Sequence, residues 1–421
     1  MEMHAFGHLT PVETARRRLL RAVRPIERTE LVPVDAAFGR IAAETVRSPR
    51  PVPSFARTTW DGYALRSRDS LGATRARPVR LEIVGEVFAE QAYPGRLRAG
   101  QTVAIATGGA VPRGADAVVI FEEVRRRGAR ISVPRPIAAG DRISAPGHDF
   151  PRGALLVRPG DDLRPTTLGA LAACGIPRVR VYARPVVAIV PNGNELLAPG
   201  ARARPGRIFE SNNATISAVV RAAGGIPRPL RPVPDDPARI EATIRRALRD
   251  ADLVLSTGGS SVGERDHLPR LLPHFGPLLF HGIAVRAGKP TLAVVAGRKV
   301  VIGMPGHPTS CLVNMFWLVL PALRRLSRRA GTGWVETDGI LGSDAVAPTP
   351  GLATVVPLER RDGRWYSMYK GSAVITSLAG ATAFALLPPG TAKVRAGERL
   401  RIFELEPPLG RGGVLPTPPN G

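Results

Sequence analysis

The pattern of apolar residues changes several times along the chain. Between residues 11 and 24 apolar positions recur at helical spacing, which predicts a helix with Thr10 as N-cap and Pro11 at its first position. Residues 56–140 instead carry short strand-like runs, at 81–84, 102–105 and 117–121, separated by glycine and proline at regular intervals. This stretch is therefore expected to form a compact β-rich insertion.

Strand-like and helix-like patterns alternate from residue 183 to residue 328. Apolar runs without alternation at 186–190 and 252–255 predict buried parallel strands, and helices are expected at 213–223, capped by Ser211 or Asn212, and at 237–249, capped by Asp236. A hairpin at 291–304 and a helix at 309–326 complete the segment. This order is typical of a doubly wound, mostly parallel α/β domain, which binds ligands at the carboxyl ends of its strands.

These patterns predict a multidomain α/β plus β fold. Its expected parts are an elongated N-terminal dimerisation region, an inserted β-rich domain, the central α/β domain, a small C-terminal β-barrel and a disordered tail. Their predicted bounds are residues 1–55 with 141–182, then 56–140, 183–328, 329–406 and 407–421.

Composition narrows the functional classes. The formal net charge is +24, but only four of the 59 basic residues are lysine and the arginines are spread along the chain, which argues against a nucleic-acid-binding arm. Cys174 and Cys311 are too few for a disulfide framework or a cysteine metal site. The longest apolar run, around residues 315–323, is too short to cross a membrane, so we expect a cytoplasmic protein.

Glycine and hydroxyl residues follow the strand predicted at 252–255. Gly258, Gly259, Ser260, Ser261 and Gly263 can direct backbone amides at an anion, and Asp266 follows at the end of this loop. An ordinary solvated turn is the alternative. Two later segments favour a ligand cleft, because residues 284–290 supply Arg286 and Lys289, and residues 303–310 form a proline-rich turn before a helix.

The same segments resemble the molybdopterin molybdenumtransferases, the family of MoeA and of one domain of gephyrin. The family pattern is roughly Gly-Gly-x-Ser-Val-Gly-x-x-Asp, then Lys-Pro-Gly-Lys-Pro, then Pro-Gly-Asn-Pro. Further similar elements are Thr59-Trp-Asp-Gly-Tyr-Ala-Leu-Arg66, Ile105-Ala-Thr-Gly-Gly-Ala-Val-Pro-Arg-Gly-Ala-Asp-Ala-Val-Val119, Gly147-His-Asp149, Val190-Pro-Asn-Gly-Asn-Glu-Leu196 and Gly371-Ser-Ala-Val-Ile-Thr-Ser-Leu-Ala379. In order and spacing the resemblance covers roughly residues 10–405.

The resemblance implies an enzyme that inserts molybdate into adenylated molybdopterin with Mg²⁺-dependent release of AMP, late in molybdenum cofactor biosynthesis. It implies catalytic roles for Asp266, Glu195, Lys289, Asp61 and Asp149, and Mg²⁺ ligands among Glu195, Asp236 and Asp266. The expected substrate-binding residues are Thr107, Gly258, Gly259, Ser260, Ser261, Gly263, Arg286, Pro305, Pro308 and Ser310. Individually, each carboxylate has the alternative role of a cap or turn residue, and Lys289 that of a solvated hairpin residue.

The resemblance also implies a homodimer in which Thr107 and Asp61 reach the cleft of the other subunit. Partners expected on the same ground are the molybdopterin adenylyltransferase and proteins of molybdoenzyme maturation; no nucleic acid and no membrane are expected. The adenylyltransferase itself is an alternative function, but it lacks the N-terminal and C-terminal β-domains.

Five positions depart from the family pattern. Arg286-Ala287 replaces a Lys-Pro pair, His148 replaces a glutamate, Asn194 an aspartate and His307 an asparagine. An arginine prefers bidentate contact with an oxyanion, and the lost charges weaken a metal site. A tungstate-specific enzyme and a non-catalytic molybdopterin-binding scaffold therefore remain as alternatives.

Overall fold

The computed structural model describes residues 9–261, 266–346, 351–371, 373–377, 380–391 and 393–406. The chain divides into two compact units. Unit 1 comprises residues 1–30, 39–41 and 182–421, and unit 2 comprises residues 31–38 and 42–181. Finer domain boundaries within these units stay predictions.

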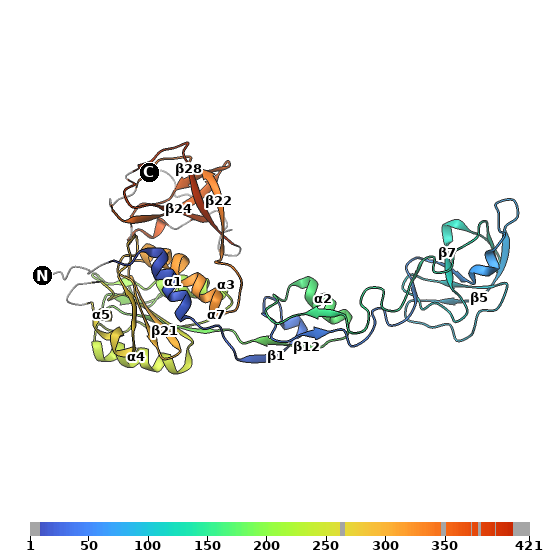
Figure 1. Cartoon of the computed structure of the whole chain (residues 1–421), viewed down its shortest axis with the longest axis horizontal. Helices are drawn as coiled ribbons and strands as arrows, with labels where there is room; N and C mark the ends of the chain where they lie inside the picture. The colour runs from blue at the N-terminus through green and yellow to red at the C-terminus, as the bar shows by residue number, and fades with distance from the viewer. Residues whose placement is uncertain are drawn as a thin grey trace. The chain divides into compact units, whose positions relative to one another are not determined.

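A six-stranded sheet forms the centre of unit 1 (Figure 1). Its order is β16 (Ile226–Pro229), β13 (Val186–Pro191), β17 (Leu253–Thr257), β21 (Lys299–Met304), β20 (Leu292–Ala296) and β18 (Leu278–His281). The first four strands are parallel, whereas β20 and β18 are antiparallel to their neighbours. The predicted hairpin at 291–304 and the mostly parallel sheet are confirmed.

Helices cover both faces of this sheet, as Figure 1 shows. Leu253 and Leu255 pack on the face that carries α1 (Val12–Ala22), α3 (Asn212–Ala222) and α7 (Leu320–Leu326). Val254, between them, packs on the opposite face with α4 (Pro237–Asp250) and α5 (Leu268–Leu271). Because both faces are buried, the strands are apolar without alternation, as the sequence predicted.

One predicted helix cap is wrong, and a second has the predicted residue but not its side-chain bond. Pro11, not Thr10, precedes α1, and Thr10 instead pairs its backbone with residues 282–284 of the chain. Ser211 precedes α3 but makes no side-chain cap hydrogen bond, and Asn212 is already the first helical residue. Ser211 is the N-cap residue by position, but the carboxylate of Glu210, one residue earlier, accepts the hydrogen bond from the Asn213 amide at 2.9 Å.

The helix predicted at 309–326 is continuous but changes its winding. It begins as α6 (Pro308–Asn314), passes through a π-helical turn (Met315–Val319) and ends as α7. Pro321 lies in the first turn after the π segment. A proline inside a helix has no amide to donate and crowds the carbonyl four residues earlier, which the wider π turn relieves.

The C-terminal part of unit 1 is rich in strands. Its main sheet has the order β19 (Val285–Arg286), β24 (Ala353–Arg361), β26 (Ala383–Leu387), β28 (Arg399–Leu405) and β22 (Trp334–Ile340), with β25 (Arg364–Ser367) on β24; β23 (Ala345–Val346) pairs with β27 (Lys393–Val394). Trp334 stacks on Trp317 of the π turn at 5.4 Å, and Phe403 meets Trp317 edge-on. These rings join the C-terminal sheet to the helical face of the central domain. The predicted tail at 407–421 lies outside the described residues.

Unit 2 contains a second six-stranded sheet, which matches the predicted β-rich insertion. Its order is β7 (Ala117–Ile120), β4 (Gly62–Leu65), β6 (Gln101–Ile105), β5 (Val79–Val87), β9 (Arg130–Val133) and β8 (Arg125–Arg127). Shorter pairs join β1 (Thr29–Pro33) to β12 (Arg178–Tyr182), β2 (Val46–Arg47) to β11 (Leu155–Val157), and β3 (Arg57–Thr58) to β10 (Ile143–Ser144), beside α2 (Pro165–Ala173). Among the described residues, no helix is both long and apolar enough to span a membrane.

Candidate functional site

A cleft of about 630 Å³ lies at the carboxyl edge of the central sheet in unit 1. Three adjacent parallel strands, β13, β17 and β21, end there and continue into loops that line it. The lining includes Glu195, Gly258, Gly259, Ser260, Ser261, Asp266, Arg286, Lys289, Pro305, His307, Pro308 and Ser310. Eleven predicted site residues thus lie around one cavity, together with His307; the predicted Gly263 lies outside the described residues.

The glycine loop after β17 has a conformation that requires glycine. Gly258 has a φ of +87°, and a Cβ there would lie 2.3 Å from the carbonyl oxygen of Asn192. The Gly258 amide donates to Met304 O at 3.1 Å, and the Leu268 amide donates to Gly259 O at 3.0 Å. The loop is therefore tied to the end of β21 on one side and to α5 on the other.

The first cleft loop, after β13, presents Glu195. Its carboxylate lies over Gly193, since a Cβ at position 193 would be 2.6 Å from both carboxylate oxygens. Asn194 and Asp235 hold this loop by a reciprocal pair of bonds: the Asn194 amide donates to Asp235 Oδ2 at 3.0 Å, and the Asp235 amide donates to Asn194 Oδ1 at 3.2 Å. Asn194 thus orders the loop without a charge.

The predicted metal ligand Asp236 has a different position from Glu195 and Asp266. Its side chain accepts from the Arg239 amide at 3.1 Å as the N-cap of α4, as the helix pattern predicted. It is absent from the described lining of the cleft. Within the described residues, no three His, Cys, Asp or Glu side chains gather closely enough to hold a metal by themselves.

The two cations come from one tightly held loop, residues 286–290. Asn314 of α6, which is 1% exposed, donates to Gly288 O at 2.9 Å and to Thr291 Oγ1 at 2.6 Å. The Thr291 hydroxyl also donates to Gly288 O at 2.8 Å. Because Gly288 O accepts twice, the backbone between Arg286 and Lys289 is fixed, and both side chains are presented to the cleft.

Asp61 and Thr107 lie in unit 2 and contact each other directly. Asp61 Oδ1 accepts from the Thr107 amide at 2.6 Å and from its hydroxyl at 2.8 Å. These two bonds, the amide bond first, lower the pKa of the Asp61 carboxyl below its ordinary value. An exposed carboxylate is thereby held ionised in one orientation.

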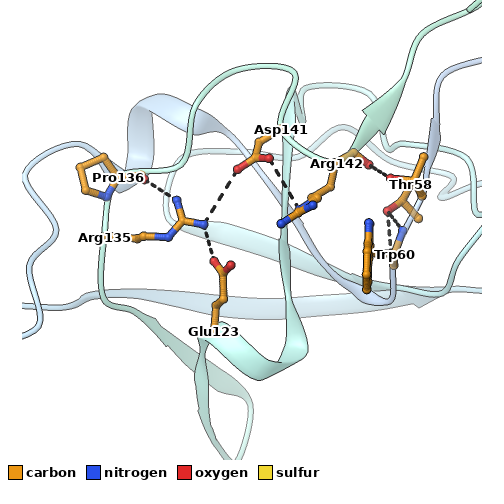
Figure 2. A network of polar contacts seen from close by, with 8 residues as sticks. Thr58, Trp60, Glu123, Arg135, Pro136, Asp141 and Arg142 are labelled. Carbon is orange, nitrogen blue, oxygen red and sulfur yellow. Dashed lines mark hydrogen bonds and ion pairs between the residues drawn. The ribbon is translucent and has the colours of Figure 1, made fainter.

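Asp149 also belongs to unit 2. With His148, Arg57 and Arg142 it lines a second cavity of about 400 Å³, and Arg57 approaches its carboxylate at 3.6 Å. Figure 2 shows two residues of this lining, Asp141 and Arg142, with Arg142 between Asp141 and the ring of Trp60. The Arg142 guanidinium is 5.3 Å from the centre of that ring, and half of the Trp60 surface is exposed. Trp60 directly precedes Asp61.

Sequence reasoning missed several residues that build the cleft. Asn192 and Asn212 line it, Glu210 and Asn314 lie behind it, and all four are buried. A buried amide or carboxylate next to a cleft loop has no local sequence signal, because its partner lies far away along the chain. Only the preceding strand end could have indicated Asn192.

Comparison of the sequence and the structure with known proteins identifies the family of this chain. Three family models match in chain order: the MoeA N-terminal region (domains I and II) over residues 10–175, a probable molybdopterin-binding domain over 188–325, and the MoeA C-terminal region (domain IV) over 343–405. A molybdopterin molybdenumtransferase of Bacillus subtilis (strain 168) is 32% identical over 404 residues, covering 93% of each chain. The chain belongs to the MoeA family of molybdopterin molybdenumtransferases.

Other members agree along nearly the whole chain. The molybdopterin molybdenumtransferase of Nostoc sp. (strain PCC 7120) is 32% identical over 392 residues, covering 90% of this chain and 89% of that one. The crystal structure of the molybdopterin biosynthesis MoeA protein from Pyrococcus horikoshii superposes with a TM-score of 0.83 at 32% identity, covering 95% of this chain and all of that chain. The resemblance and the multidomain fold inferred from the sequence are confirmed, and the chain is an enzyme of the transferase class.

Proposed function

We propose that this MoeA-family protein inserts molybdate into adenylated molybdopterin and releases AMP, late in molybdenum cofactor biosynthesis. The observation that carries the proposal is the convergence of the glycine loop, the Arg286–Lys289 loop and two carboxylates on one cleft. The reaction needs two anion sites, one for the nucleotide phosphates and one for the oxyanion. Backbone amides at a strand end and fixed cations are suited to both.

The residues divide this work by their chemistry. The amides of the glycine loop and the hydroxyls of Ser260 and Ser261 bind phosphate oxygens, while Lys289 and Arg286 neutralise charge at the phosphate and the oxyanion. Glu195 and Asp266 would hold Mg²⁺, which commonly takes one or two carboxylates and completes its shell with water and substrate phosphate oxygens. When bound there, Mg²⁺ would polarise the phosphoryl group. Asp236 is a weaker candidate ligand because it already caps α4.

The site requires a second subunit in this proposal. Asp61, Thr107 and Asp149 belong to unit 2, whereas the cleft lining lies in unit 1. We propose a homodimer in which these residues complete the cleft of the other subunit, with the ionised Asp61 carboxylate held by Thr107. Location in the cytoplasm, and molybdopterin adenylyltransferase and molybdoenzyme maturation factors as partners, are parts of the same proposal.

The test is AMP release by the purified protein from adenylated molybdopterin, with Mg²⁺ and either molybdate or tungstate. Oxyanion-dependent AMP formation supports the transferase, and the preferred oxyanion names the cargo. Asp266→Ala and Lys289→Ala should each lower kcat/KM at least about a hundredfold, whereas Asp236→Asn should have a much smaller effect. Full activity of Asp266→Ala would contradict the proposal.

The Arg286-Ala287 pair favours a second candidate, a tungstate-specific enzyme or a molybdopterin-binding scaffold. A guanidinium grips an oxyanion by two parallel hydrogen bonds, and tight retention slows release. If the protein binds the adenylated pterin but forms no AMP with either molybdate or tungstate, the scaffold is favoured. Arg286→Lys distinguishes a tungstate-specific enzyme from a scaffold. In an enzyme it should change the preference between molybdate and tungstate, whereas in a scaffold it should leave the affinity for the pterin unchanged.

A further inference from the structure

A buried carboxylate that the proposed reaction does not use lies behind the cleft. Glu210 is only 4% exposed and lies two residues before Asn212, the first residue of α3. Both of its carboxylate oxygens accept from the Asn213 amide, at 2.9 and 3.1 Å. A carboxylate at this position caps the helix and interacts favourably with its dipole. Burial nevertheless raises the pKa of Glu210, so keeping this charge inside the protein costs folding free energy.

The helix that Glu210 caps begins with Asn212, whose side chain reaches the proline-rich turn. Asn212 Nδ2 donates to Gly306 O at 2.9 Å, and Asn212 itself lines the cleft. Gly306 in turn lies against the glycine loop, since a Cβ at Gly306 would be 3.3 Å from the Cα of Gly258. One side-chain hydrogen bond, from Asn212 to Gly306, therefore holds the Pro305–Pro308 turn in place against the glycine loop.

The same short segment also anchors the Glu195 loop. The Ile208 amide donates to Glu195 O at 2.8 Å, and the Glu210 amide donates to Leu197 O at 2.8 Å, as part of the pairing between β14 (Leu196–Leu197) and β15 (Ile208–Phe209). Residues 208–212 thus touch two cleft loops, one through backbone pairing and the other through Asn212.

We propose that Glu210 and Asn212 are positioning residues that hold the Pro305–Pro308 turn against the glycine loop in the geometry that binds the substrate phosphates. The proposal rests on the function proposed above. It explains why a buried carboxylate is kept at a place where a neutral N-cap such as the neighbouring Ser211 would cost less. Neither residue needs to contact the reacting atoms.

Asn212→Ala and Asn213→Ala form a matched pair for the test. Asn213 lies in the same helical turn and is also partly buried, but its side chain donates to Leu230 O and is absent from the described cleft lining. Loss of the Asn212 bond should raise KM for adenylated molybdopterin about tenfold, with kcat within about twofold, because the turn binds ground state and transition state alike. AMP affinity, measured by calorimetry on the full-length protein, should fall by a similar factor, while Asn213→Ala changes neither.

Glu210 variants test the cap independently. Glu210→Gln keeps the shape and one acceptor, so it should raise KM less than Glu210→Ala, and Ser211→Ala should have no effect because Ser211 makes no cap bond. Equal KM and equal AMP affinity in Asn212→Ala and Asn213→Ala would overturn the proposal. This comparison holds even if the Glu210 variants do not fold, because it does not use them. Absence of AMP release by the wild type overturns the proposed function instead. The positioning role of Glu210 and Asn212 is then tested by AMP affinity alone. A wild type that neither releases nor binds AMP overturns both.

Discussion

At the scale of single residues, Asp61 offers a direct test through its pKa. Thr107→Val removes one of its two hydrogen bonds, so the pKa of Asp61 should rise towards its ordinary value. If the ionised form acts in the reaction, the acid limb of kcat/KM should move to higher pH. AMP release measured between about pH 4 and pH 8 gives the profile.

Thr59→Val is the control for that experiment. Thr59 lies two residues before Asp61 and its hydroxyl donates to Arg142 O instead, at 3.3 Å. Its removal should leave the pH profile unchanged. An acid limb that stays in place in Thr107→Val would show that Asp61 does not titrate in the rate-limiting step.

Predictions about single residues were correct where the conformation depends on neighbouring residues in the sequence. Gly258 was expected to adopt a turn that points amides at an anion, and its positive φ and its closeness to Asn192 show why no other residue fits. The predicted cap of α1 failed because a distant segment competed, whereas at α3 a neighbouring residue supplied the capping side chain. Thr10 pairs with residues 282–284 rather than capping α1, and Glu210 takes the role that Ser211 would have by local pattern.

At the scale of secondary-structure elements, an ion pair fixes the start of the central sheet. Arg28 donates to both carboxylate oxygens of Asp252 at 2.6 and 2.8 Å, and the Val186 amide donates to the same carboxylate at 2.7 Å. Burial would raise the pKa of Asp252, but these bonds outweigh it and hold the pKa below its ordinary value. One carboxylate therefore joins β13 to β17.

Asp252→Asn should lower the free energy of unfolding by about 2 kcal/mol at pH 7, the usual size for hydrogen bonds to a charged group. A carboxyl whose pKa is depressed in the folded state stabilises it above the unfolded pKa, and this contribution is lost as the pH falls through the folded value. The difference from the wild type in urea unfolding should therefore shrink as the pH falls below the ordinary aspartate pKa of 3.8. Glu27→Gln, which breaks only the exposed pair with Arg298, should have no measurable effect.

The loop of residues 286–290 depends on its contact with α6. Asn314→Ala removes the donor to Gly288 O and Thr291 Oγ1 and should destabilise the fold by about 1–3 kcal/mol, with a higher KM for the oxyanion. Gly288→Ala should destabilise as well, because its φ is +118° and its Cβ would lie 2.5 Å from the Asn314 amide group.

The double variant distinguishes these two causes. Without the Asn314 amide the new methyl group has no atom to clash with. The double variant should therefore lose less unfolding free energy than the sum of the losses in the two single variants. Strict additivity would mean that the backbone conformation of Gly288, rather than its contact with α6, sets the cost.

At the scale of the whole molecule, the order of elements was predictable and the assembly of the cleft only in part. Alternation of strand-like and helix-like patterns predicted a doubly wound sheet, and the rule that ligands bind at carboxyl strand ends agrees with the cleft beside the loop after β17. The pattern did not predict that β19, which carries Arg286, joins the C-terminal sheet through β24. Such pairing depends on contacts between distant segments, which local hydrophobic periodicity does not encode.

Whether one site needs two chains is a property of the assembled molecule, and mixing two inactive variants decides it. Asp61→Ala removes a residue of unit 2, and Lys289→Ala removes a residue of the cleft in unit 1. In a dimer of one chain of each kind, a site shared between subunits leaves one cleft with both residues intact. Two differently tagged chains, purified together, should then recover about half of the wild-type activity, although each variant alone is inactive.

A site built within one chain predicts the opposite result. Every cleft of the mixed dimer would then lack either Asp61 or Lys289, and mixing would restore nothing. Lys289→Ala mixed with Asp266→Ala is the internal control, because both residues line the same cleft and no arrangement of subunits reunites them. Recovery in the first mixture but not in the second would therefore assign Asp61 to the partner's cleft, independently of how large each single defect is.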